Sequence, residues 1–161
     1  LMKVGDDFNI KPFGIRAMDS MRIEKSYRLI PREMSIEYSA LESGLDRFVK
    51  LDKACDFVGK AGLSAWQKKG FNNTFVTLEV HDITDADARG SEGIYKNGEL
   101  IGRATSGGFG FRVNKSLALG MVLSNYAIEG AELEIEILGQ RHRATVIPES
   151  AFDAENLALR S

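Results

Sequence analysis

The sequence predicts an α+β protein with helices in residues 1–69 and an antiparallel sheet in residues 70–161. Near residue 15, apolar residues recur every three positions, which is typical of a helix. Beyond Gly70, short runs of alternating apolar and polar residues replace that pattern. Turn residues separate these runs at regular spacing, which indicates a β-sandwich or barrel. We therefore expect two domains with a boundary near residue 70.

The first helix is expected to begin near Pro12, because a proline lacks the N–H group that a first helical turn leaves unpaired. Ile15, Met18 and Met21 then fall on one apolar face. Pro31 prevents the helix from continuing.

Two further elements are expected before the sheet. Residues 45–51 alternate enough to predict a strand. A second helix is predicted over residues 59–67, because the basic pair Lys68-Lys69 and then Gly70 provide the usual chemistry of a helix end.

The remaining strands follow from alternation and turn signals. Asn97-Gly98 is a strong signal for a two-residue hairpin, and Gly139-Gln140 is expected to form another turn. Residues 81–93 are acidic and lack a period, so they are predicted to form a loop. The expected strands are 74–80, 94–96, 99–101, 117–122, 132–138 and 141–147.

Composition excludes several classes of function. The net charge of −2 argues against nucleic-acid binding by phosphate neutralisation. Cys55 is the only cysteine, so no internal disulfide can form, which fits a reducing compartment such as the cytoplasm. No apolar run approaches the roughly 20 residues of a membrane span. His81 and His142 stand alone, so neither a metal site nor a catalytic triad is predicted.

Six motifs occur in a fixed order along the chain, beginning with RAMDSMRIEK at residues 16–25. The other five lie at residues 40–45, 52–60, 102–108, 115–120 and 152–160. Together they resemble the glycine-cleavage T-protein family of aminomethyltransferases. The resemblance is closest to the folate-binding portion of dimethylglycine and sarcosine dehydrogenases. It implies that the second half forms the antiparallel C-terminal β-barrel of that fold.

The resemblance also implies a longer parent protein. In the family, an N-terminal part carries the catalytic aspartate and much of the folate pocket, and neither has a counterpart here. We therefore expect a C-terminal fragment that has no catalytic residue, is inactive alone, and needs the N-terminal part as its partner. Tetrahydrofolate is the implied cofactor, whereas FAD would belong to a separate N-terminal domain. We expect no metal.

The implied activity is transfer of a one-carbon unit from an N-methyl amine to tetrahydrofolate. One alternative is the T protein of glycine cleavage. Another is a non-catalytic folate-binding module related to tRNA-modification proteins, whose K-G-C-[YF]-x-G-Q-E motif is absent. A third is an assembly surface that shields the intermediate.

Arg16, Glu24 and Tyr27 are the cofactor-binding candidates that the resemblance implies. A guanidinium can hold a carboxylate of the folate tail with two hydrogen bonds. In glycine-cleavage T proteins the ligand-contacting arginine directly precedes Asp-Ser, where this chain has Met18. Arg16 lies about 200° away on an ideal helix, so it is either ligand-facing or structural. Tyr27 either stacks on the pterin or packs the helix end.

Four further features complete the predicted site. Asp19 and Arg22 are spaced to pair across one turn, and a buried ion pair of Arg22 with Glu24 or another lobe is also expected. Residues 106–110 are glycine-rich but lack the context of a phosphate cradle, so a bulge or barrel corner is predicted. The resemblance implies that Lys115 and the tail at 152–160 face the folate side.

Overall fold

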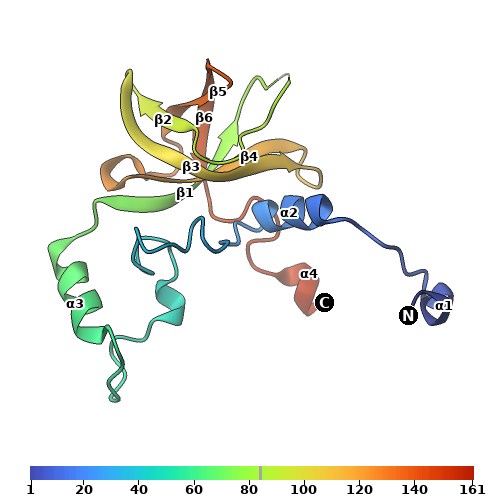
Figure 1. Cartoon of the computed structure of the whole chain (residues 1–161), viewed down its shortest axis with the longest axis horizontal. Coiled ribbons are helices and arrows are strands. Elements are labelled where there is room, and N and C mark those ends of the chain that lie inside the picture. Colours follow the sequence, from blue (N-terminus) through green and yellow to red (C-terminus); the bar gives the residue numbers. More distant parts are fainter. Residues whose placement is uncertain (84) are drawn as a thin grey trace.

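The computed structural model describes residues 1–83 and 85–161, apart from the side chain of Leu159. Its strands form a closed antiparallel barrel in the order β1-β4-β3-β2-β5-β6, and β6 pairs back onto β1 (Figure 1). The predicted barrel is thus confirmed. The strands are β1 (Asn73–Val80), β2 (Gly93–Lys96), β3 (Glu99–Gly110), β4 (Lys115–Leu123), β5 (Glu132–Ile137) and β6 (Gln140–Ile147).

Two tight hairpins join neighbouring strands. Asn97 and Gly98 have φ angles of 52° and 84°, as a two-residue turn between twisted strands requires. The β5–β6 turn uses Leu138 and Gly139, at 49° and 78°, so it lies one residue earlier than predicted. The β3–β4 register shifts between Ala104 and Ser106, which places the bulge before the glycine run.

The barrel has one face exposed on some strands and both faces buried on others. Along β5 burial alternates, because one face packs inside the barrel and the other meets solvent. In β4, every residue between its two ends is buried. Its inward side chains join the core around Leu78 and Ile94, whereas Leu119 and Met121 pack outside the barrel with Phe75. The N-terminal region covers this outer face.

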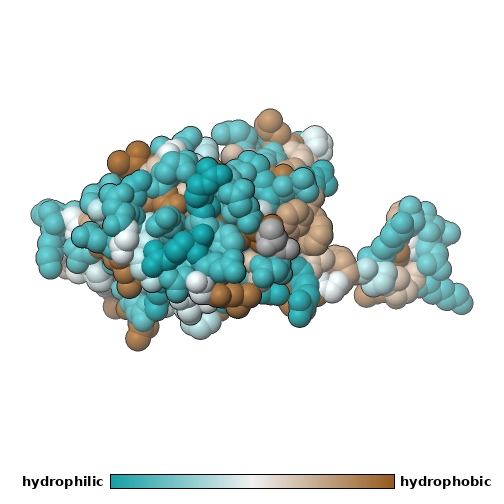
Figure 2. All heavy atoms as spheres, turned by 90° about the horizontal axis from the view of Figure 1, so that it is seen from above, coloured by the Kyte–Doolittle hydropathy of each residue, from teal (hydrophilic) through white to brown (hydrophobic). Residues whose placement is uncertain are grey.

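The α-helices lie on that outer side and at the ends of the chain (Figure 1). Helix α2 packs against β3 and β4. Helix α1 projects away from the barrel as a separate lobe (Figure 2). The α-helices are α1 (Met2–Gly5), α2 (Ile15–Glu24), α3 (Lys60–Lys69) and α4 (Leu157–Arg160). Short 3₁₀ helices span Asp6–Phe8, Asp46–Phe48 and Ser124–Tyr126.

The structure corrects two predictions about α2. The helix begins at Ile15 rather than near Pro12, because Gly14 is still extended. The predicted apolar face of Ile15, Met18 and Met21 does not pack on the barrel, because these side chains are 71%, 49% and 49% exposed. Ile23 is instead 1% exposed, because the helix turns a different face onto β3.

The predicted strand at 45–51 is also wrong. This segment contains the 3₁₀ helix Asp46–Phe48, and Phe48 is 70% exposed. Alternation alone does not make a strand, because a strand needs a neighbour to satisfy its backbone groups. In the described part of the chain, no strand lies before Asn73. The division into two domains near residue 70 stays a prediction.

Among the described residues, no helix has the length and apolar character needed to cross a membrane.

Candidate functional site

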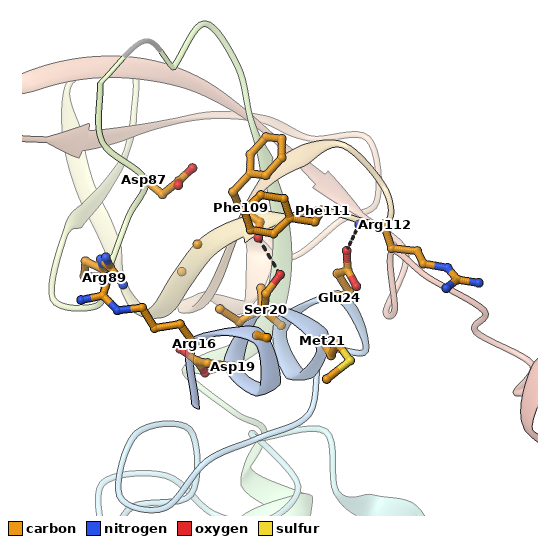
Figure 3. Close-up of a pocket in the computed structure, with 14 residues that line it drawn as sticks. Arg16, Asp19, Ser20, Met21, Glu24, Asp87, Arg89, Phe109, Phe111 and Arg112 are labelled. Atoms are coloured by element: carbon orange, nitrogen blue, oxygen red, sulfur yellow. Dashed lines mark hydrogen bonds between the residues drawn. The ribbon is translucent and has the colours of Figure 1, made fainter. Parts of the chain in front are cut away.

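A pocket of about 730 Å³ lies between α2 and the barrel (Figure 3). Helix α2 forms one wall and contributes Arg16, Ser20 and Glu24. The segment before β2 contributes a second wall. The end of β3 and the following turn form the third. The pocket therefore depends on how closely α2 docks on β3.

Two contacts set this docking. The hydroxyl of Ser20 donates to the carbonyl of Phe109 at 2.7 Å. A Cβ added to Gly108 would lie 3.4 Å from Ile23 Cδ1, so the helix packs directly on the strand backbone. Gly107 makes a similar close approach on its other side, where an added Cβ would meet the Ala88 carbonyl at 2.5 Å. The glycine run thus forms a smooth strand surface rather than a phosphate cradle.

Glu24 is buried and orders the turn after β3. Its Oε1 accepts hydrogen bonds from the backbone N–H groups of Arg112, at 2.6 Å, and Val113, at 3.3 Å (Figure 3). Its backbone carbonyl accepts the N–H of Phe152 at 3.0 Å. The carboxylate therefore shapes the pocket wall. Direct contact between Glu24 and a ligand stays a prediction.

Arg16 lines the pocket as well, together with Arg89 from the segment before β2. Both side chains extend toward the same edge of the pocket (Figure 3). Within the described residues, neither guanidinium forms an ion pair with a carboxylate. This edge therefore carries two guanidinium groups that are not engaged in a direct ion pair with a described residue.

Arg22, by contrast, is fully engaged. Its Nε and Nη2 donate to Asp19 Oδ1 at 2.9 and 2.6 Å, which confirms the predicted pairing across one turn. Its Nη1 lies 3.8 Å from Glu33 Oε2 and donates to Ser106 Oγ at 3.2 Å. Of the partners expected for a buried ion pair, Glu24 or another lobe, Glu24 is wrong because it faces the turn after β3. The buried carboxylate beside Arg22 is that of Glu33.

Tyr27 lies outside the pocket. It follows the end of α2, is 47% exposed, and its backbone carbonyl accepts a hydrogen bond from Arg22 Nη1 at 3.2 Å. Met18, at the position of the family's ligand-contacting arginine, is not among the pocket residues either. Of the three candidates, the structure brings Arg16 and Glu24 together and leaves Tyr27 apart.

The resemblance also implied that Lys115 and the C-terminal tail face the folate side, and these two lie in different places. Lys115 Nζ pairs with Glu79 Oε2 at 2.6 Å, away from the pocket. The C-terminal tail folds back onto the end of α2, where Lys25 Nζ donates to Asn156 Oδ1 at 2.7 Å. The Arg112 guanidinium stacks over the Phe152 ring at 4.8 Å.

Sequence reasoning missed the pocket residues that come from the barrel side. Phe109 and Phe111 meet edge to face with ring centroids 5.1 Å apart and form an apolar wall. Asp87 accepts the Ser116 hydroxyl at 2.6 Å through Oδ1. No periodicity marked these positions, because Asp87 and Arg89 lie in a predicted loop and the predicted strand 99–101 ended too early. An apolar wall, carboxylate acceptors and a cationic edge together suit a flat ligand with an anionic end.

In the part of the chain that the structure describes, no three His, Cys, Asp or Glu side chains gather as a metal site would require.

Comparison with known proteins identifies related sequences on both sides of the pocket. A family model described as "Glycine cleavage T-protein C-terminal barrel domain" matches residues 73–153. A second, described as "GCVT N-terminal domain", matches residues 1–53. The first therefore covers the barrel, and the second covers α2.

Individual relatives agree with this result. The chain is 37% identical over 149 residues to the mitochondrial dimethylglycine dehydrogenase of Homo sapiens, covering 92% of the chain and 17% of that protein. It is 37% identical over 148 residues to an aminomethyltransferase of Desulfitobacterium hafniense, covering 92% of the chain and 40% of the relative. The chain thus spans less than half the length of either relative.

A solved structure shows the same fold. The glycine cleavage system aminomethyltransferase T of Bartonella henselae superposes with a TM-score of 0.85 at 25% identity. The match covers 95% of this chain and 43% of that one.

Proposed function

The chain belongs to the glycine cleavage T-protein family, and we propose that it forms the folate-facing C-terminal part of a protein that transfers a one-carbon unit from an N-methyl amine to tetrahydrofolate. The observation that carries the proposal is the order of the two family matches, 1–53 and 73–153. Those ranges contain α2 and β3, which form two of the three walls of the pocket.

The pocket residues fit a reduced folate. Ligand pockets are commonly about 300–1,000 Å³, and this one has about 730 Å³. The rings of Phe109 and Phe111 can pack against a flat heterocycle. Arg16 can bind a carboxylate of the glutamate tail with two hydrogen bonds.

Bound tetrahydrofolate would supply the nitrogen that accepts the carbon unit. The residues of this chain would bind and orient it: Arg16 at the anionic end, and the phenyl rings by excluding water from the apolar wall. Glu24 would keep the turn after β3 in place through its two backbone hydrogen bonds. We assign no catalytic residue to this chain, so proton transfer and amine binding would belong to the rest of the protein.

We favour the dimethylglycine and sarcosine dehydrogenase branch over the T protein of glycine cleavage. The identity of 37% to a member of each branch does not decide between them. The position of Arg16, two residues before Met18, favours the dehydrogenase branch, as does the run Asp46-Arg47-Phe48. Assaying the longer protein for 5,10-methylene-tetrahydrofolate with N,N-dimethylglycine, sarcosine and the aminomethyl donor of glycine cleavage will identify the amine.

We also propose a reducing compartment such as the cytoplasm, on the basis of the single free and exposed Cys55. The human relative is mitochondrial by name.

Calorimetric titration of the chain with 5-formyl-tetrahydrofolate tests folate binding. We expect saturable binding no tighter than about 100 μM, because one wall of a pocket gives fewer contacts than a closed site. An absence of heat up to millimolar ligand, in the chain and in the longer protein alike, would contradict folate binding.

A further inference from the structure

The segment that carries Arg89 packs directly on β3. Ala88 is 0% exposed, and its carbonyl lies where a Cβ on Gly107 would stand. Gly90 has a φ of +125°, and a Cβ there would meet the Thr105 carbonyl at 2.5 Å. A side chain at Gly107 or at Gly90 would collide with the opposite backbone. The close packing of this segment on β3 therefore requires glycine at both of these positions.

Hydrogen bonds also fix both peptide groups of Arg89. Its N–H donates to Glu92 Oε1 at 2.7 Å, and the N–H of Gly90 donates to Glu92 Oε2 at the same distance. The carbonyl of Arg89 accepts a hydrogen bond from Arg32 Nη1 at 3.2 Å. The backbone at this position is thus held by one carboxylate and one guanidinium. The side chain of Arg89 leaves this support and lines the pocket.

In the described part of the chain, two guanidinium groups at the edge of the pocket have no direct ion-pair partner. Arg16 and Arg89 approach the same edge from different elements (Figure 3), and within the described residues neither forms an ion pair. Of the carboxylates that line the pocket, Asp19 pairs with Arg22, whereas Asp87 and Glu24 accept hydrogen bonds from the Ser116 hydroxyl and the Arg112 N–H. Like charges at one edge repel each other, and a bound anion relieves that repulsion.

We propose that Arg16 and Arg89 together form a binding site for a carboxylate-bearing ligand. Arg89 supplies the pre-positioned arm, and Arg16 supplies the second arm from the first turn of α2. Two sources share this chemistry: the glutamate tail of a reduced folate and the carboxylate of an N-methylated amino acid. The identity of the ligand rests on the proposed function, whereas the carboxylate site itself rests on the geometry of the two arginines.

The test uses the chain and three probes in phosphate-free buffer. p-Aminobenzoyl-glutamate carries the folate tail without the pterin, its dimethyl ester removes both negative charges, and N,N-dimethylglycine represents the amino-acid source. Binding is followed by calorimetry and by the NMR signals of the arginine Nε–H groups, assigned from Arg16→Ala and Arg89→Ala. Arg47→Ala is the matched control, because Arg47 is exposed and outside the pocket.

We expect p-aminobenzoyl-glutamate to shift the Nε–H signals of Arg16 and Arg89 and to leave that of Arg47 unchanged. Arg89→Ala should weaken binding about tenfold, as loss of a charged hydrogen-bonding partner usually does. Arg89→Lys should be intermediate, since it keeps the charge and loses the fork. The dimethyl ester should bind wild type and Arg89→Ala equally. Backbone amide spectra of the variants check that they remain folded.

The remaining outcomes separate the two ideas. If N,N-dimethylglycine alone gives these effects, the site holds and its source is the amine substrate. If the tail probe binds through both arginines while 5-formyl-tetrahydrofolate does not bind, the carboxylate site stands and the proposed function fails. If neither carboxylate probe shifts the two arginine signals, or if folded Arg89→Ala binds like wild type, the site is overturned, even where a folate binds through its pterin.

Discussion

The barrel and the N-terminal region bury opposite kinds of side chain. The barrel core consists of apolar residues such as Leu78, Ile94 and Ile135, each 0% exposed. Among the described residues before position 70, Ile23 is the one apolar side chain that is fully buried. The other buried side chains of that region are polar: Glu24, Ser26, Glu33, Ser39, Glu42 and Ser43.

The two regions are therefore held in place by different kinds of interaction. Apolar burial in the barrel is non-directional and tolerates small shifts. The N-terminal region is instead held on the outside of the barrel by individual polar contacts. Glu33, for example, accepts the hydroxyls of Thr105 at 2.6 Å and Ser106 at 2.5 Å. A network of this kind holds the N-terminal region at one position on the barrel. Any shift would leave buried polar groups without hydrogen-bond partners, which is costly. We call the contact between the N-terminal region and the outside of the barrel the junction. The pocket lies at this junction.

The largest effect is expected in the barrel. Leu78→Ala should lower the free energy of unfolding by about 4 kcal/mol, from lost burial and the cavity that remains. Equilibrium unfolding in urea measures this, with Leu100→Ala as the control because Leu100 is 64% exposed. A loss below about 1 kcal/mol would mean that the barrel core is not the main source of stability.

The junction should show a smaller and more local effect. Glu33→Ala leaves two hydroxyls and the Leu29 N–H without their shared acceptor, which should cost about 2–3 kcal/mol. Hydrogen exchange should accelerate in residues 22–45 and stay unchanged in β5 and β6. Glu129→Ala, at an exposed position, is the control. Equal acceleration throughout would remove the distinction between the two regions.

Ligand binding should depend on the junction more than on the barrel surface. In the intact protein, Arg16→Ala should weaken folate or substrate use about tenfold, because a guanidinium fork beside a carboxylate is hard for water to replace. Lys115→Ala should have a smaller effect, since Lys115 pairs with Glu79 outside the pocket. Steady-state kinetics measure both. Wild-type kinetics for Arg16→Ala would return Arg16 to a structural role.

The smallest effect is expected at a single cap. The Ser39 hydroxyl accepts the N–H of Glu42, and Glu42 Oε2 accepts the N–H of Ser39 at 2.9 Å, which is the reciprocal pattern of a capping box. Ser39→Ala should cost about 1 kcal/mol in urea unfolding. Ser35→Ala should cost less, because Ser35 accepts only one exposed N–H. Equal losses would show that the reciprocal bonds add nothing.

The same difference explains what the sequence could predict. Alternation marked β5 and β6, because their burial follows the pleat of a strand. In β1 the sequence alternates as well, although residues 75–78 are buried on both faces. The end of β3 was missed, because residues 107, 108 and 110 are glycines and carry no side chain to show a pattern.

At the junction, spacing predicted the bond between Asp19 and Arg22, which are neighbours on the helix. It could not predict Glu33 as a partner, because that contact depends on the path of an irregular segment. Arg89 was missed for the same reason, since a loop residue reaches the pocket only through tertiary packing.

The closure of the barrel has a consequence for the order in which the chain can fold during synthesis. β1 is made first among the strands, yet its partners are β4 and β6. Until β4 has left the ribosome, both edges of β1 are open, and the second edge waits for β6, which ends at Ile147. Pairing of strands so distant in the chain is slow, and open apolar edges can join other chains. β1 is therefore the strand that a chaperone would need to protect longest.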